Sequence, residues 1–301
     1  MIAPIDPASQ AFLFGLDQVQ QRFNRAQLEL TTGLRINTVS DDPALISSLA
    51  QIQSQIAQNT QITQNLGQVK LETDTAEQAL SSAVTQVEQA QQLGTQGASS
   101  FASPQTQQTL ATQVGSILEN LVGIASTTVE GRHIFSGDAD QINPYTVNLA
   151  LVNPVSAYLG SAATRQVQHP DGSLIPVSLT AQQIFDSGAP GNNVYQSLNA
   201  MRLALQAGDI NAINAALPGL KSAGTFLNQQ LAFYGTVQTR IAGATTYAAN
   251  QSTSLQTQLS TIRDADSALA ITELTLAQTQ EQAAFESRAK LPRGSLFDFL
   301  A

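Results

Sequence analysis

The sequence predicts a mainly α-helical protein: an elongated antiparallel bundle or coiled coil of long helices formed by both chain ends, with a small β-rich inserted domain. Three observations support this fold class. Apolar residues recur at alternating spacings of three and four toward both ends of the 301-residue chain, as on one face of a helix. Between residues 135 and 191 this spacing is lost, and prolines and short β-prone runs appear. The helical stripes are too long for one globular core, so the two chain ends are expected to pair with each other.

The N-terminal segment, residues 1–42, is predicted to hold one helix followed by a turn. Its apolar stripe ends just before Gly33, a residue type that commonly stops a helix. Asp42 and Pro43 then have the order of a helix N-cap and first helical position, and a second helix of about 50 residues follows. The stripe of the first helix consists of Leu16, Val19, Phe23, Ala26 and Leu30.

Ser103 and Pro104 repeat this start signal for a third helix, which we expect to run toward Gly131. Residues 135–191 are predicted to form the β-rich inserted domain. Its strands are expected in the runs TRQVQ and LIPVSL, on either side of an HPDG turn.

Helical spacing returns at Val194, pauses at Gly208 and continues through a second very long helix to Leu269. We assign residues 43–134 and 192–264 to a helical rod domain and residues 265–301 to a C-terminal assembly helix. This last segment is apolar on more than one side, which indicates that a partner covers it. We expect residues 1–42 to be disordered in the free monomer, because their stripe has no complete intramolecular partner.

The composition excludes several classes of protein. The chain has no cysteine and only two histidines, which excludes disulfide scaffolds, zinc fingers, iron–sulfur clusters and thiol catalysis. A formal net charge of −9 argues against binding to nucleic acid or to an anionic membrane surface. The apolar runs are too short for membrane insertion, and the first ten residues lack the pattern of a cleaved signal peptide.

No constellation of residues favours catalysis. The Asp41–Asp42 pair is explained more simply by helix capping than by paired catalytic carboxylates. His133 and His169 have no ligand or nucleophile nearby in the sequence, so capping or surface roles are favoured. We therefore expect no catalytic, metal-binding or cofactor-binding site, and no enzymatic activity.

Two terminal blocks carry a family resemblance. The run LTTGLRINTVSDDPALI (30–46) resembles the N-terminal signature of bacterial flagellins, and the run ITELTLAQTQEQAAFESRAKLPRGSLFDFL (271–300) resembles their C-terminal signature. With the stripes between them, the resemblance covers roughly 220 residues of the chain. The central run GRHIFSGD (131–138) and residues 157–185 are similar to the variable domain of the hook-associated protein 3 family, the hook–filament junction proteins.

The resemblance implies a structural subunit of the bacterial flagellum that links hook to filament by polymerisation of its terminal helices. Two alternatives remain open: a short flagellin that forms the filament itself, and a soluble coiled-coil scaffold. The implied partners are further copies of the chain in a helical layer, hook protein, an adjacent hook-associated protein or flagellin, and an export chaperone. The implied location is extracellular, after export through the flagellar type III apparatus without a cleaved signal peptide.

The expected subunit-interface residues lie in the two terminal segments. On the loop after the first helix, Arg35 is expected by resemblance to reach a carboxylate or carbonyl of a neighbouring subunit. The alternative is a local ion pair with Asp41 or Asp42. The full set is Leu16, Phe23, Leu30, Arg35, Ile36, Asn37, Ile271, Leu274, Leu276, Phe285, Leu296 and Phe297.

Overall fold

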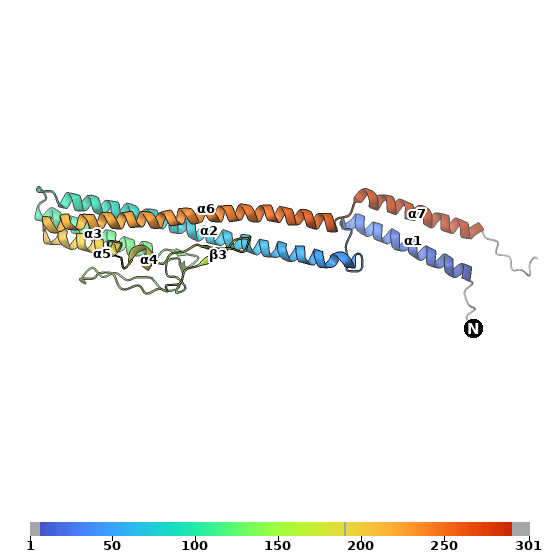
Figure 1. Cartoon of the computed structure of the whole chain (residues 1–301), viewed down its shortest axis with the longest axis horizontal. Helices are drawn as coiled ribbons and strands as arrows, with labels where there is room; N and C mark the ends of the chain where they lie inside the picture. The colour runs from blue at the N-terminus through green and yellow to red at the C-terminus, as the bar shows by residue number, and fades with distance from the viewer. Residues whose placement is uncertain (1–6, 190, 291–301) are drawn as a thin grey trace, which may run out of the picture. The chain divides into compact units, whose positions relative to one another are not determined.

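The structure is a computed structural model that describes residues 7–189 and 191–290, and it divides into two compact units (Figure 1). One unit contains the described residues up to 58 and from 251 onward, and the other contains residues 59–250. The helices are α1 (Pro7–Thr32), α2 (Pro43–Gly97), α3 (Pro104–Ala125), α4 (Ala181–Phe185), α5 (Val194–Ala207), α6 (Ile210–Arg263) and α7 (Ser267–Lys290). The strands are β1 (Thr128–Val129), β2 (Arg132–His133), β3 (Gln166–Gln168) and β4 (Leu174–Pro176).

Several helix boundaries lie where the sequence predicts them. Helix α2 begins at Pro43, and Ser103 caps α3 by accepting a hydrogen bond from the Thr106 amide at 3.2 Å. Helix α5 ends at Ala207 and is capped by Gly208, whose φ of 69° is a left-handed conformation that glycine adopts without steric cost. Local capping and turn preferences are therefore sufficient to set these boundaries.

The predicted extension of the third helix toward Gly131 is wrong. Helix α3 ends at Ala125, and a short antiparallel hairpin of β1 and β2 follows, with Thr128 opposite His133. The turn places both Glu130 and Gly131 at positive φ. His133 consequently lies on a strand and not at a helix end.

In the unit of residues 59–250, α2 and α6 run antiparallel along each other. The Asn59 side chain donates to the Ala248 carbonyl at 2.8 Å, and the Gln91 side chain donates to the Leu220 carbonyl at 3.3 Å. The two helices therefore run in opposite directions. Along α2, Ile62 and Leu66 are buried with residues of α6, β3 and β4, and the apolar residues from Ala76 to Ala90 are buried in a core shared with α3, α5 and α6. This confirms the predicted antiparallel long-helix fold.

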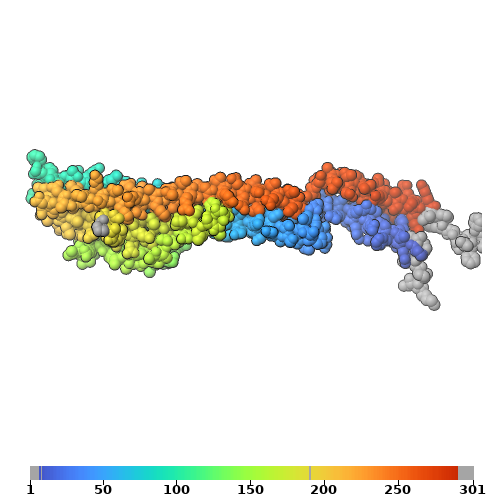
Figure 2. Space-filling view, viewed as in Figure 1, coloured from blue at the N-terminus to red at the C-terminus, as the bar shows by residue number. Residues whose placement is uncertain are grey.

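The segment of residues 135–189 contains less β-structure than its description as β-rich implies. Its described strands are β3 and β4, which pair Val167 with Ile175 on the two sides of the predicted turn. The rest is loops and the short helix α4, and in the space-filling view the green to yellow-green segment lies against the orange surface of α6 (Figure 2). Phe135 and Phe185 belong to the same apolar core as the rod helices. The insertion is therefore part of the helical unit's core.

An ion-pair cluster fixes this insertion to α2. The Glu72 carboxylate, which is largely buried, lies 2.9 Å from the Arg165 guanidinium and 3.5 Å from that of Arg132. One carboxylate on α2 therefore connects β2 and the chain entering β3.

The second long helix is interrupted before Leu269. Helix α6 ends at Arg263 and α7 starts at Ser267, close to the predicted start of the C-terminal segment at residue 265. The Asp266 carboxylate accepts hydrogen bonds from the amides of Ala268 and Leu269, which stabilises the start of α7. No helix within the described ranges is long and apolar enough to cross a membrane.

Candidate functional site

The two terminal helices, α1 and α7, lie side by side and form what we call the terminal pair (Figure 1). Small and medium side chains make the seam: Val19 and Ala26 of α1 and Ala270 and Ala277 of α7 are at most 8% exposed. At the far end, Arg288 donates to the Ser9 hydroxyl at 2.6 Å. Its guanidinium also lies 5.5 Å from the centre of the Phe12 ring. The helices of both chain ends thus pack together as predicted.

The large apolar side chains of the terminal pair are mostly on its outside. Seven of them are between 45 and 67% exposed, five others are half-buried, and the alanines of the seam are buried. A helix pair that buries alanine and exposes several leucine and phenylalanine side chains leaves much of its apolar surface in contact with water. The exposed set is Leu13, Phe14, Leu28, Leu269, Ile271, Leu276 and Phe285.

The predicted interface residues of the terminal helices fall into two groups. On α1, Leu16, Phe23 and Leu30 are half-buried, and so is Leu274 on α7. The exposed group on α7 consists of Ile271, Leu276 and Phe285. Leu296 and Phe297 lie outside the described residues.

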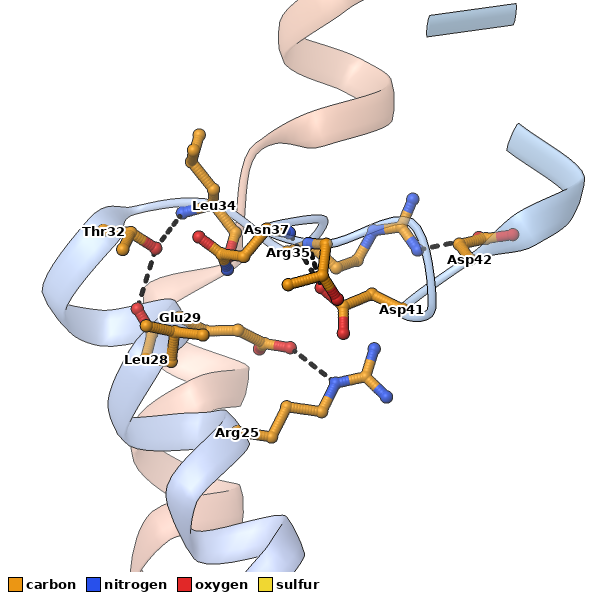
Figure 3. Close-up of polar contacts among 10 residues, drawn as sticks. Arg25, Leu28, Glu29, Thr32, Leu34, Arg35, Asn37, Asp41 and Asp42 are labelled. Atoms are coloured by element: carbon orange, nitrogen blue, oxygen red, sulfur yellow. Dashed lines mark hydrogen bonds and ion pairs between the residues drawn. The ribbon is translucent and has the colours of Figure 1, made fainter. Parts of the chain in front are cut away.

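The loop after α1 and the break before α7 form a second feature, which we call the joint: residues 33–42 together with 262–266 (Figure 3). Gly33 ends α1 with a φ of 70°. The chain then runs antiparallel to the break: Leu34 and Asp264 form a β-bridge, and the Ala265 amide donates to the Gly33 carbonyl at 2.9 Å. The Arg35 amide donates to the Arg263 carbonyl at 2.7 Å.

The Arg35 side chain connects three parts of the joint. Its guanidinium donates to the Asp42 carboxylate at 3.3 Å (Figure 3). It also donates to the Ile262 carbonyl at 2.6 Å. The planar fork of arginine can reach two acceptors at once, which lysine cannot reproduce. The local ion pair that the sequence left as the alternative is therefore present, and a backbone carbonyl of α6 is an additional partner.

Asp41 stabilises the conformation of the loop by accepting hydrogen bonds from its backbone. Its carboxylate accepts hydrogen bonds from the amides of Asn37 at 2.8 Å and Thr38 at 2.7 Å, and these two bonds hold the pKa of Asp41 below its usual value. The Asn37 side chain donates to the Leu34 carbonyl at 2.7 Å. The two aspartates thus act separately: Asp41 organises the loop, and Asp42 pairs with Arg35.

Ile36 does not match the expectation of a residue presented on the loop surface. Its side chain is only 5% exposed within this chain. The backbone bonds of the joint turn this segment toward the end of α6, and the Ile36 amide itself lies 3.4 Å from the Arg263 carbonyl oxygen. The sequence pattern of a ten-residue loop cannot predict this burial, because the segment that covers Ile36 is remote in the sequence. Arg35 and Ile262, which are in contact, are 227 positions apart.

Comparison with known proteins gives the joint a family context. Residues 7–140 match the bacterial flagellin N-terminal helical region, and residues 217–300 match the bacterial flagellin C-terminal helical region. The chain belongs to the bacterial flagellin family. The two segments of the joint lie inside these two regions, whereas residues 141–216, which include most of the insertion, lie between them.

Several of the similar proteins are hook-associated proteins. Flagellar hook-associated protein 3 of Escherichia coli (strain K12) is 23% identical over 305 aligned residues, which cover 94% of each chain. The structure of flagellar hook-associated protein 3 from Legionella pneumophila aligns with a TM-score of 0.63 at 13% identity, covering 71% of this chain and 98% of that one. FlgL from Bacillus cereus aligns with a TM-score of 0.58 at 22% identity, covering 69% and 98%. These relatives favour the predicted hook-associated resemblance over a short filament flagellin.

Proposed function

We propose that this flagellin-family protein is a structural subunit of the bacterial flagellum that joins hook to filament through its terminal helices. The observation that carries the proposal is the terminal pair, which leaves seven large apolar side chains between 45 and 67% exposed. Water contact with this much apolar surface is unfavourable, and neighbouring subunits would remove it. The similarity to hook-associated protein 3 supports the junction position within the flagellum.

Neighbouring copies of the chain are the first proposed partners. Repeated head-to-tail contacts between identical subunits generate a ring or a helical layer. Only 12% of the residues are charged, so close packing would bury few unpaired ions. Hook protein on one side, and an adjacent hook-associated protein or flagellin on the other, would cover the two ends of that layer. The segment of residues 135–191 would face outward.

The proposed mechanism is polymerisation coupled to folding. The terminal segments would travel unfolded through the export channel, guarded by an export chaperone, and would become helical as they pack in the layer. Apolar burial against neighbours would offset the entropy lost on ordering. The role is structural, and the flagellum outside the cell is its proposed location.

A deletion strain tests this function. We expect cells that keep their hooks, lose their filaments and release flagellin into the medium, because a filament without its junction does not stay attached. Reintroduction of the wild-type gene should restore the filament. Cells that lack filaments without releasing flagellin would indicate that the protein is itself the filament flagellin. Filaments that remain normal in the deletion strain would overturn the proposal.

A further inference from the structure

Asn59 of α2 is a buried polar residue at one end of the unit of residues 59–250. It is 7% exposed, and its side-chain nitrogen donates to the Ala248 carbonyl of α6 at 2.8 Å. Its side-chain oxygen is also buried, but it accepts no hydrogen bond from any residue that the structure describes. A buried acceptor without a donor is unfavourable, so Asn59 makes the pairing of α2 and α6 weaker at this point than an apolar residue would.

The apolar stripe of α2 is interrupted at the same point. Its positions there are separated by four, three, three and four residues, and they are Ile52, Ile56, Asn59, Ile62 and Leu66. A heptad repeat alternates steps of three and four residues. Two successive steps of three break this repeat and locally overwind a pair of helices. The sequence pattern and the buried amide therefore mark the same discontinuity.

The apolar clusters of the unit stop next to Asn59. Within the described residues, they begin on α2 at Ile62 and end on α6 at Ala244. The next contact toward the joint joins Asn59 to Ala248, a small residue, so it buries little apolar surface. The helix pair is therefore weakly stabilised where its clusters end.

Beyond this contact lie residues 43–58 of α2 and 251–263 of α6, which we call the joint-side segments. They belong to the other compact unit, together with the joint. All of these residues are described, and one side chain on each helix is buried: Ile52 at 8% and Leu255 at 4% exposure. Helices that bury so few side chains open locally more readily than a packed core does.

We propose that Asn59 separates two cooperative folding units, so that the joint-side segments open transiently while residues 59–250 stay folded. An uninterrupted apolar stripe would couple the packing of the two units, and they would unfold together. A buried asparagine in a helix pair lowers stability at its own position, which uncouples them. The joint can then change its conformation without unfolding the helical unit. This inference concerns the free chain and does not depend on the junction role.

Native-state hydrogen exchange on the full chain tests the uncoupling. In the wild type, the slowest amides of the joint-side segments should share one opening equilibrium constant, at least about tenfold larger than that of residues 59–250. Val87→Ala removes buried apolar contacts from α2 inside the unit of residues 59–250, because Val87 is 0% exposed. It should accelerate the slowest amides of that unit about tenfold and leave the joint-side segments unchanged.

Asn59→Leu tests the role of the asparagine itself. It removes the unpaired acceptor and continues the apolar stripe, so exchange in the joint-side segments should become about tenfold slower. Asn59→Val adds less volume and serves if leucine does not fit. The matched control is Thr73→Val: Thr73 is also buried on α2, at 1% exposure, but its hydroxyl donates to the Lys70 carbonyl at 3.0 Å. That variant should leave exchange in the joint-side segments unchanged.

Three results would overturn the proposal. The first is exchange of the joint-side segments only through global unfolding in the wild type. The second is equal acceleration of both units by Val87→Ala, which would show that they unfold as one. The third is unchanged exchange in the joint-side segments of both Asn59 variants, which would show that Asn59 does not set the boundary.

Discussion

Arg35 and Ile262 lie 227 positions apart in the sequence, yet a 2.6 Å hydrogen bond joins the guanidinium of one to the backbone carbonyl of the other. Because Arg35 follows α1 and Ile262 is in the last turn of α6, this bond ties the N-terminal loop to the start of the C-terminal segment. The same guanidinium pairs with Asp42, directly before α2. A single side chain therefore links both family regions of the chain at the joint.

Replacement of Arg35 should loosen the joint. Arg35→Ala removes one bond to a carbonyl and one partly exposed ion pair, so the joint should lose about 1–2 kcal/mol. Arg35→Lys should restore only part of the lost stability, because a lysine ammonium cannot bond to both acceptors with the planar geometry of a guanidinium. Hydrogen exchange at the last turn of α6 measures the effect, and it should be faster in both variants.

The control for Arg35 is Arg25→Ala, since Arg25 pairs with Glu29 within α1 and acts on the joint through its charge, which attracts Asp41. That pair is worth about 0.3–0.5 kcal/mol, so exchange in α6 should not change. Unchanged exchange in Arg35→Ala would show that the joint is open in the free chain. In that case the result would support a role of Arg35 between subunits.

The exposed leucines of α7 should matter for assembly more than for folding. Leu276→Asp places a carboxylate on the outside of the terminal pair, where the free chain tolerates it. In a subunit layer the same carboxylate would be buried in every copy at a cost of several kcal/mol. We expect a chain with unchanged melting temperature that fails to restore motility in a deletion strain.

Ala277→Asp is the matched comparison for Leu276→Asp. Ala277 is buried in the seam at 2% exposure, so a charge there should disrupt the terminal pair itself. The two variants are one residue apart and have the same introduced charge, but they lie on different faces of α7. Full motility with Leu276→Asp would remove this face of α7 from the assembly surface.

The free chain should lose its ends first under protease. The seam of the terminal pair buries small side chains and therefore contributes little apolar stabilisation. Limited proteolysis of dilute protein should trim both termini and leave a core near residues 43–262, roughly 24 kDa. If residues 267–290 resist cleavage as well as the core does, the expectation of disordered ends in the monomer is wrong.

The Glu72 cluster should stabilise the unit of residues 59–250. Glu72→Ala leaves the guanidiniums of Arg132 and Arg165 without their shared carboxylate, and we expect a loss of about 1–3 kcal/mol in urea unfolding. Lys70→Ala, which breaks only the exposed pair with Asp74, should change stability by less than about 0.5 kcal/mol. If the two variants lower the free energy of unfolding equally, the Glu72 cluster does not stabilise this unit more than an exposed ion pair does.

The loop closed by Asp41 should open in acid. The folded pKa of Asp41 is lowered, so its carboxylate contributes stability above the unfolded value of about 3.9 and loses that contribution as the pH falls through the lower folded value. The amide protons of Asn37 and Thr38 should therefore exchange faster as the pH falls below about 4, after correction for intrinsic rates. Asp41→Asn should show fast exchange already at neutral pH and no acid transition.

The sequence by itself determined the helices and their main boundaries. Proline and capping residues at Pro43, Ser103 and Gly208 act within one turn of the backbone, and a heptad stripe specifies its own buried face. The terminal signatures likewise identified the family, since they are continuous runs of residues. These features depend on near neighbours, so one chain without any structure was enough to predict them.

Tertiary structure alone decided the joint and the seam. Ile36 is buried and Arg35 is held within the chain because residues 262–266 pair with the loop. The face of α7 that is covered carries Ala270 and Ala277, although the leucines are the stronger apolar signal. In each case the deciding contact joins segments remote in sequence, and neither local propensity nor periodicity carries information about such a partner.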